Sequence, residues 1–135
     1  MRESKRKHLE FVQGVVNRLS TNSFLLKGWS VGLVSALFAL ASMNSNRAFL
    51  ILTYLPVIMF WGLDGYCLWQ ERLYRRLFDI IRQRPEEETD FSMSTAAVPR
   101  IRGLHWFDAV FSKTLLVFHG TIFVALVVIM TIGFN

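Results

Sequence analysis

One stretch, residues 48–84, limits what this chain can fold into. It begins as an apolar run, AFLILTYLPVIMFWGL, contains one acid at Asp64, and continues as the basic sequence WQERLYRRLFDIIRQR. A helix rises about 1.5 Å per residue, so about 20 apolar residues cross the hydrocarbon core of a bilayer, which is about 30 Å thick. The stretch therefore predicts one long helix that spans a membrane over 48–69 and continues into water to residue 84.

Two further apolar blocks have the same length, Phe24–Ser42 and Leu115–Phe134. The chain is 53% hydrophobic, and what lies outside the three blocks is too short for an independent core. The blocks do not alternate polar and apolar residues, which excludes membrane strands. We expect an all-α integral membrane protein, a single membrane domain over 1–135 with three transmembrane helices at 24–42, 48–69 and 108–134.

The residues before the first block form an amphipathic pattern over 4–21. Leu9, Val12, Val16 and their neighbours fall on one arc of a helix, which favours a surface helix on the membrane or on other helices. The sequence STNS at 20–23 predicts a break, with Asn22 or Ser23 as the N-cap of the first span. A signal-peptidase site at 39–41 is the alternative, but the long polar leader argues against cleavage.

The segment 85–105 is a composition break that opens with Pro85 and several acids. It predicts a cytoplasmic loop, either flexible or ordered as a short hairpin around Phe91 and Met93 that receives a ligand or a partner.

Basic residues predict the orientation. Apart from Lys113 at the start of the third span, twelve arginines and lysines lie before the first block or between the second and third, against only Arg47 between the first two. The N-terminus and the long loop are therefore expected in the cytoplasm, and the C-terminus outside. The net charge of +5 is explained by topology and by attraction to anionic lipid, so no nucleic-acid partner is expected.

Asp64 is the most informative polar residue of the spans. A carboxylate at this depth costs several kcal/mol unless it is paired or hydrated. Lys27 and Lys113 lie at comparable depth, so the sequence predicts a buried pair of Asp64 with one of them. The pair either fixes helix register, or belongs to an ion or proton path or to a polar ring in an oligomer.

Tyr66 and His119 are the other candidates for this intramembrane polar cluster. A histidine inside a span either makes an interhelical hydrogen bond or acts as a proton-sensitive switch. The predicted cluster comprises Lys27, Asp64, Tyr66, Lys113 and His119.

Two further faces are expected to carry contacts. Small residues recur every four positions at Gly28, Gly32 and Ala36, which lets helices approach closely, either within one chain or between subunits. The apolar stripe on the second helix beyond the membrane needs a cover: the N-terminal helix, a second copy or the headgroup layer. We assign this stripe, as a partner or self-association face, to Leu73, Leu77, Ile80 and Ile81.

The sequence offers no catalytic chemistry. Cys67 is the only cysteine, and the chain has no phosphate-binding loop, nucleophile elbow or paired-histidine zinc motif. We expect no enzyme activity, no metal and no cofactor.

The segments HLEFVQGVVNRL, SFLLKGWSVGLVSALFAL, FWGLDGYCLWQERLYRRLFD, DFSM and FSKTLLVF resemble a family of short, poorly characterised bacterial multi-span membrane proteins. Members are encoded near anti-phage defence genes, including those of Toll/interleukin-receptor-like proteins. The resemblance implies an inner-membrane location and a role as a membrane effector or its partner.

Two main hypotheses for function follow. In the first, the chain oligomerises and permeabilises the inner membrane on a cytoplasmic trigger, such as a defence protein or a nucleotide-derived signal. In the second, it is a non-conducting anchor for a soluble enzyme. A small proton-coupled transporter is the third hypothesis. It ranks below the other two because a chain with three spans and one acidic residue could transport protons only as an oligomer.

Overall fold

The computed structural model describes residues 3–44, 47–101 and 103–133. It contains α1 (Glu3–Asn44), α2 (Arg47–Gln83), the short 3-10 helix η1 (Glu86–Glu88), α3 (Trp106–Val110) and α4 (Lys113–Ile132). The prediction of an all-α protein is confirmed, and no strand occurs in these ranges. Three of the described helices, α1, α2 and α4, are long and apolar enough to cross a membrane.

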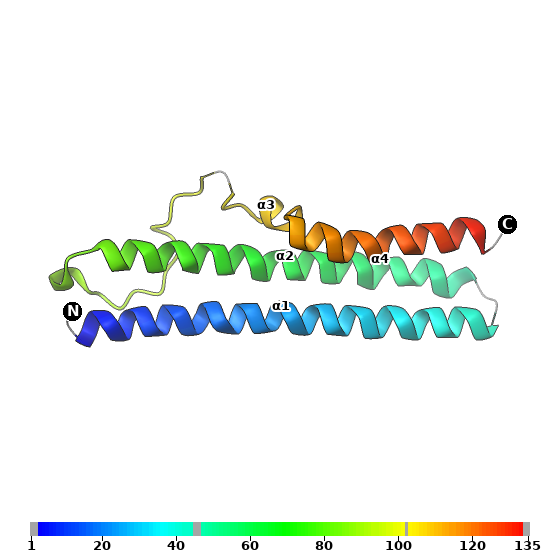
Figure 1. Cartoon of the computed structure of the whole chain (residues 1–135), viewed down its shortest axis with the longest axis horizontal. Helices are drawn as coiled ribbons and strands as arrows, with labels where there is room; N and C mark the ends of the chain where they lie inside the picture. The colour runs from blue at the N-terminus through cyan, green and yellow to red at the C-terminus, as the bar shows by residue number, and fades with distance from the viewer. Residues whose placement is uncertain (1–2, 45–46, 102, 134–135) are drawn as a thin grey trace.

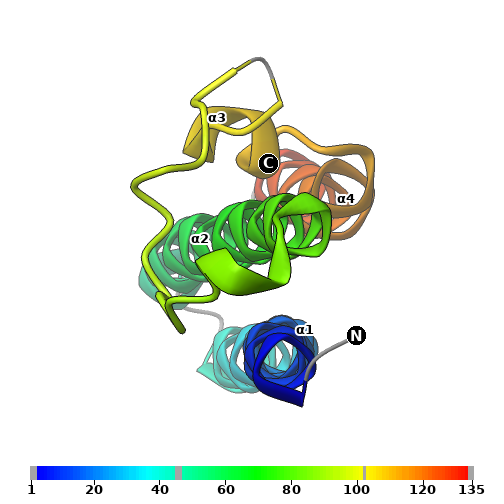
Figure 2. The ribbon, with the colours of Figure 1, turned by 90° about the vertical axis from the view of Figure 1, so that its left-hand side faces the viewer.

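The three long helices lie side by side with α2 in the middle. α1 and α2 form an antiparallel hairpin, and α4 packs against α2 away from α1 (Figures 1 and 2). The N-terminal end of α1 lies at one end of the molecule. The end of α4 lies at the other, beside the end of α1 and the start of α2 (Figure 1).

α1 continues without interruption through residues 20–23, so the predicted break was wrong. The polar side chains there have partners other than a helix end. The Thr21 hydroxyl donates to the carbonyl of Asn17 one turn earlier, at 3.0 Å, which is compatible with a continuing helix. Ser23 donates instead to Asp64 on α2. The expected amphipathic helix and first span are therefore one helix.

One end of the hairpin, together with the segment that follows α2, forms a part that we call the extension, residues 3–22 and 66–101. Its core joins Leu9 and Val12 of α1 to Leu73, Leu77 and Ile81 of α2, all of them buried. Of the three covers expected for the stripe on α2, the structure shows the N-terminal helix. The burial of apolar area between these two faces holds the extension together.

After α2, the chain turns back along the extension as a strap, residues 84–101. The Lys5 ammonium donates to the carbonyls of Arg82 and Arg84, at 2.9 and 2.8 Å, where it satisfies carbonyls at the end of α2. The ring of His8 donates from Nε2 to the carbonyl of Ser92 at 2.8 Å. The strap therefore follows the surface of the hairpin, and its Val98 completes the core.

The remaining described helices form the span region, residues 23–44, 47–65 and 106–132. Its core contains Val34 and Ala41 of α1, Leu50 and Val57 of α2, and Leu126 of α4. The short helix α3 packs closely against α2 at Gly65. A methyl group on Gly65 would collide with the Val110 side chain and press on its Cα, so this crossing requires glycine.

Candidate functional site

The carboxylate of Asp64 is the centre of the candidate site, and it receives donors from both neighbouring helices. The Lys27 ammonium of α1 lies 2.6 Å from Oδ2, and the His119 ring nitrogen Nε2 of α4 lies 2.8 Å from the same oxygen. Oδ1 accepts a hydrogen bond from the Ser23 hydroxyl of α1. One buried carboxylate thus ties all three long helices together.

Local helix geometry brings these donors to the acid. Ser23 and Lys27 are four residues apart on α1, so both face α2, and the ammonium also donates to the Ser23 hydroxyl at 2.8 Å. Asp64 and His119 are fully buried, whereas the Lys27 side chain keeps 19% of its surface exposed. His119 lies roughly 9 Å along α4 from its first residue. Ser23 and Asp64 lie at the ends of the span region on α1 and α2, so the cluster is buried near the boundary with the extension.

Aromatic rings enclose the site. The ring of Trp61 stacks on that of His119, with 6.0 Å between centroids and an interplanar angle of 11°. Phe118 meets His119 edge-on at 5.0 Å, and the Lys27 ammonium lies 5.9 Å from the centre of the Phe118 ring. These apolar walls keep water and its dielectric screening away, which strengthens the attraction between Lys27 and Asp64.

The geometry also fixes the tautomer of His119. A carboxylate only accepts hydrogen bonds, so a neutral His119 carries its hydrogen on Nε2. Its Nδ1 is then bare, buried and without a hydrogen-bond partner among the described residues. This orphaned acceptor distinguishes the cluster from a fully satisfied structural ion pair.

The structure brings together three of the five residues predicted for the polar cluster: Lys27, Asp64 and His119. Of the two cations considered for Asp64, it selects Lys27. Lys113 is exposed at the first residue of α4 and has no ion pair within the described ranges. Tyr66 is half exposed and lies edge-on against Trp69 at 5.8 Å. These two residues therefore lie outside the site.

Sequence reasoning missed Ser23, which it interpreted as a helix cap. The signal was its spacing of four residues from Lys27, which places the two side chains on one face of a continuous helix.

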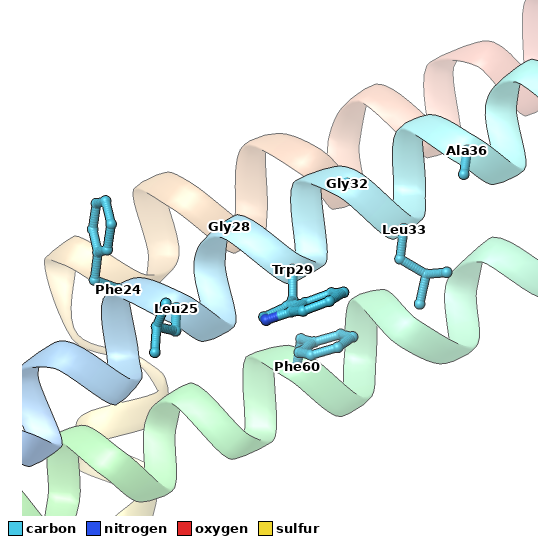
Figure 3. A pocket seen from close by; sticks show the side chains of 8 residues that line it. All are labelled: Phe24, Leu25, Gly28, Trp29, Gly32, Leu33, Ala36 and Phe60. Atoms are coloured by element: carbon cyan, nitrogen blue, oxygen red, sulfur yellow. The ribbon is translucent and has the colours of Figure 1, made fainter.

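The small-residue ridge of α1 lies on the outside of the bundle. A methyl group added to Gly28 or Gly32 would meet nothing within 4 Å, so the ridge does not pack against any other described part of the chain. The ridge instead lines an open groove of about 670 Å³. Figure 3 shows Trp29 of α1 and Phe60 of α2 pointing toward one another in it. The groove is lined by Phe24, Leu25, Gly28, Trp29, Gly32, Leu33, Ala36 and Phe60.

The predicted partner face on α2 is not a free surface. Leu73, Leu77 and Ile81 are at most 2% exposed, because α1 and the strap cover them, and Ile80 is half-buried. Its assignment to a partner or a second copy was wrong. The periodicity located the stripe correctly but did not identify what covers it.

No group of three metal-ligating side chains occurs in the part of the chain that the structure describes, and Cys67 is a free, buried thiol. Comparisons of the chain with protein-family models, with curated proteins and with solved structures found no match.

Proposed function

We propose that this chain is an inner-membrane effector of a bacterial anti-phage defence system, which oligomerises and permeabilises the membrane on a cytoplasmic trigger. The link to defence rests on the resemblance of its segments, such as FWGLDGY and QERLYRRLF. The observation that carries a functional role is the buried Lys27–Asp64–His119 cluster between membrane-spanning helices.

A cluster of this kind is costly to keep for structure alone. A buried ion pair is often no more stabilising than well-packed apolar residues of similar size. Ionisable groups inside spans are rare and commonly mark ion or proton pathways. The orphaned nitrogen of His119 adds an unsatisfied polar atom to that cost.

Oligomerisation gives the groove on α1 a role. Gly28 and Gly32 leave the α1 backbone accessible from outside, and such sites let a second helix approach closely. A single chain of three spans surrounds its charges with aromatic rings, so permeation requires several copies whose polar clusters line a shared path.

The proposal places the N-terminus in the cytoplasm and the end of α4 outside. Supporting this orientation, the arginine-rich part of α2 and the strap share one end of the molecule with the N-terminal end of α1 (Figure 1). A periplasm-active phosphatase fused after residue 135 should be active, and one inserted after Thr95 should be inactive. The reverse pattern would overturn the orientation.

Dye release from liposomes tests permeabilisation. Purified chain is reconstituted at increasing protein-to-lipid ratios, which replace the trigger by driving assembly through mass action, and release of an encapsulated dye is recorded. Release should rise more steeply than in proportion to protein, and Gly32→Leu should abolish it by filling the groove. Gly14→Leu is the matched control, because Gly14 lies on the same helix, also faces open space and lies outside the groove. No release at any ratio, or equal release from both variants, would overturn the proposal.

A non-conducting anchor is the second candidate, and Phe91 is the observation that favours it. Its backbone has a φ of +55°, and the residue remains 44% exposed on the strap. A non-glycine residue held in this conformation often belongs to a functional surface. Under this hypothesis, Phe91→Ser should lose a soluble defence partner in a pull-down, while liposomes containing the chain stay sealed.

A further inference from the structure

Two donors compete for one oxygen at the centre of the site. The Lys27 ammonium and the His119 Nε2 both bind Oδ2 of Asp64, at 2.6 and 2.8 Å, while Ser23 occupies Oδ1. With a neutral imidazole the charges balance, because one ammonium faces one carboxylate. The unpartnered Nδ1 of His119 is the place where another proton binds.

The groups that face His119 decide what a second positive charge does. α1 contributes Lys27 and Ser23, and α2 contributes Asp64, with the Cys67 thiol one turn further along. The nearest cation on α4 itself is Lys113, two turns away and exposed. A protonated His119 therefore leaves two cations on one carboxylate oxygen. At low dielectric their repulsion is several times larger than in water.

Lys27 is the cation that can leave. The His119 ring is fully buried, stacked on Trp61 and flanked by Phe118. The Lys27 ammonium sits on a flexible four-carbon chain that is already 19% exposed, and such chains extend easily to the membrane surface. Lys27 also directly precedes Gly28, which lines the groove on α1.

We propose that Nδ1 of His119 is a proton-binding site, and that proton uptake there makes the imidazolium the charged partner of Asp64 and displaces Lys27. One proton is taken up and forms an N–H bond with the lone pair of Nδ1, and no other covalent bond forms or breaks. The displacement breaks the Lys27–Asp64 ion pair between α1 and α2. This ion pair lies beside the groove that, in the proposed function, binds a second copy of the chain. The inference rests on the proposed function, because it names the proton as the event that frees α1 for assembly.

Histidine NMR tests the site in the full chain embedded in lipid nanodiscs. With 15N-labelled histidine, His119 should show one hydrogen-bearing and one bare nitrogen at pH 8, and the bare nitrogen should gain a hydrogen on acidification. His8→Gln and His105→Gln variants assign the signals. A His119 that already carries hydrogens on both nitrogens at pH 8, or that stays neutral down to pH 4, would overturn the proposal.

Spin-label distances test the displacement. Labels on exposed Thr21 of α1 and exposed Val117 of α4, in a Cys67→Ala background, should move apart in the same pH step that protonates His119. His119→Gln retains a donor for Asp64 but cannot bind the proton, so its distance should not change with pH. Lys27→Met should still bind the proton but lose the distance change. A pH-dependent distance change that persists in both variants would show that Lys27 is not displaced.

Dye release separates this inference from the proposed function. If His119→Gln liposomes leak with the pH dependence of the unmodified chain, the proton trigger is wrong and the effector stands. If the proton step and the distance change occur without any leak, the effector is wrong and the proton site stands.

Discussion

The extension and the span region have opposite distributions of polar and apolar side chains between interior and surface. In the extension, apolar Val12 and Leu73 are fully buried, while charged Arg75 and Arg76 face outward. In the span region, Asp64 is fully buried, and the outward side chains are apolar, for example Leu55 at 58% exposed. The same backbone pairing of α1 with α2 supports both patterns, so the surrounding solvent, water or lipid, accounts for the reversal.

Tryptophans mark where one pattern changes to the other. The indole N–H of Trp61 donates to the carbonyl of Val110, and that of Trp69 to the carbonyl of Leu104, at 2.9 and 3.0 Å. Trp106 returns a hydrogen bond to Gly62 at 3.2 Å. The first two bonds satisfy carbonyls of the stretch that leads into α4, and the third joins that stretch to a carbonyl of α2. Indole, with an apolar body and one donor, suits a membrane–water boundary.

Replacing Asp64 with leucine should give the largest effect of the changes considered. It removes the acceptor that Lys27, His119 and Ser23 share, and it leaves the fully buried His119 ring without a partner for Nε2. Removing one member of a buried ion pair costs about 3–5 kcal/mol. The unfolding midpoint in detergent should fall sharply.

The control for this change is Asp79→Asn in the extension. Asp79 pairs with Arg82 at 3.6 Å, but both side chains are about half exposed. An exposed pair contributes about 0–1 kcal/mol, so the midpoint should barely move. Similar losses in the two variants would show that the span region is as hydrated as the extension, and the comparison between them would fail.

Alanine substitutions at two leucines of α2 should give the next largest effect and test the reversal directly. Leu73→Ala opens a cavity in the extension core and should cost about 2–5 kcal/mol. Leu55→Ala removes a side chain that is 58% exposed in the span region, so stability in detergent should change little. Thermal unfolding measures both. Equal losses would mean that a contact between copies covers Leu55.

The fold was largely predictable because its signals are local. Apolar length located the spans, and period-3.6 patterns found the faces of α1 and α2 that pack together. The uninterrupted α1 was missed because cap preferences describe what Ser23 can do at a helix end. They do not reveal that a carboxylate on another helix will take its hydroxyl.

The sequence predicted the kind of site, a buried carboxylate with a cationic partner, but not which residues take part in it. Depth in the span suggested both Lys27 and Lys113 as partners of Asp64, and only the packing of α1 on α2 decides between them. Tyr66 is two residues from Asp64, so it points to another side of α2 and meets Trp69 instead. That Nδ1 of His119 has no hydrogen-bond partner depends on three-dimensional packing, so the sequence could not predict it.

Two glycines on α2 provide a smaller and more local test at the boundary. An added methyl group on Gly65 would collide with Val110, whereas one on Gly62 would make an ordinary contact with Trp106 at 3.7 Å. Gly65→Ala should therefore cost about 1–3 kcal/mol through overpacking. Gly62→Ala should be neutral or slightly stabilising, because alanine favours the helix. Thermal unfolding in detergent compares them, and an unaffected Gly65→Ala would show that α3 does not contact α2 this closely.

The pH dependence of the strap should give the smallest effect. The backbone N–H of Ser92, which donates to Asp90 at 3.0 Å, lowers the pKa of that carboxyl, and Arg84 at 3.8 Å adds to this. Because the pKa is lower in the closed strap than in the released one, the ionised Asp90 holds the strap closed above its ordinary pKa of about 4. That contribution disappears as the pH falls through the lowered pKa. Hydrogen exchange of the strap should therefore accelerate slightly below about pH 4, relative to the exchange of α2.

Asp90→Asn, which keeps an acceptor for Ser92 but no charge, should not show this acceleration. Histidine side chains in general change charge at about pH 6–7, so an acceleration confined to that range would assign strap release to a histidine instead.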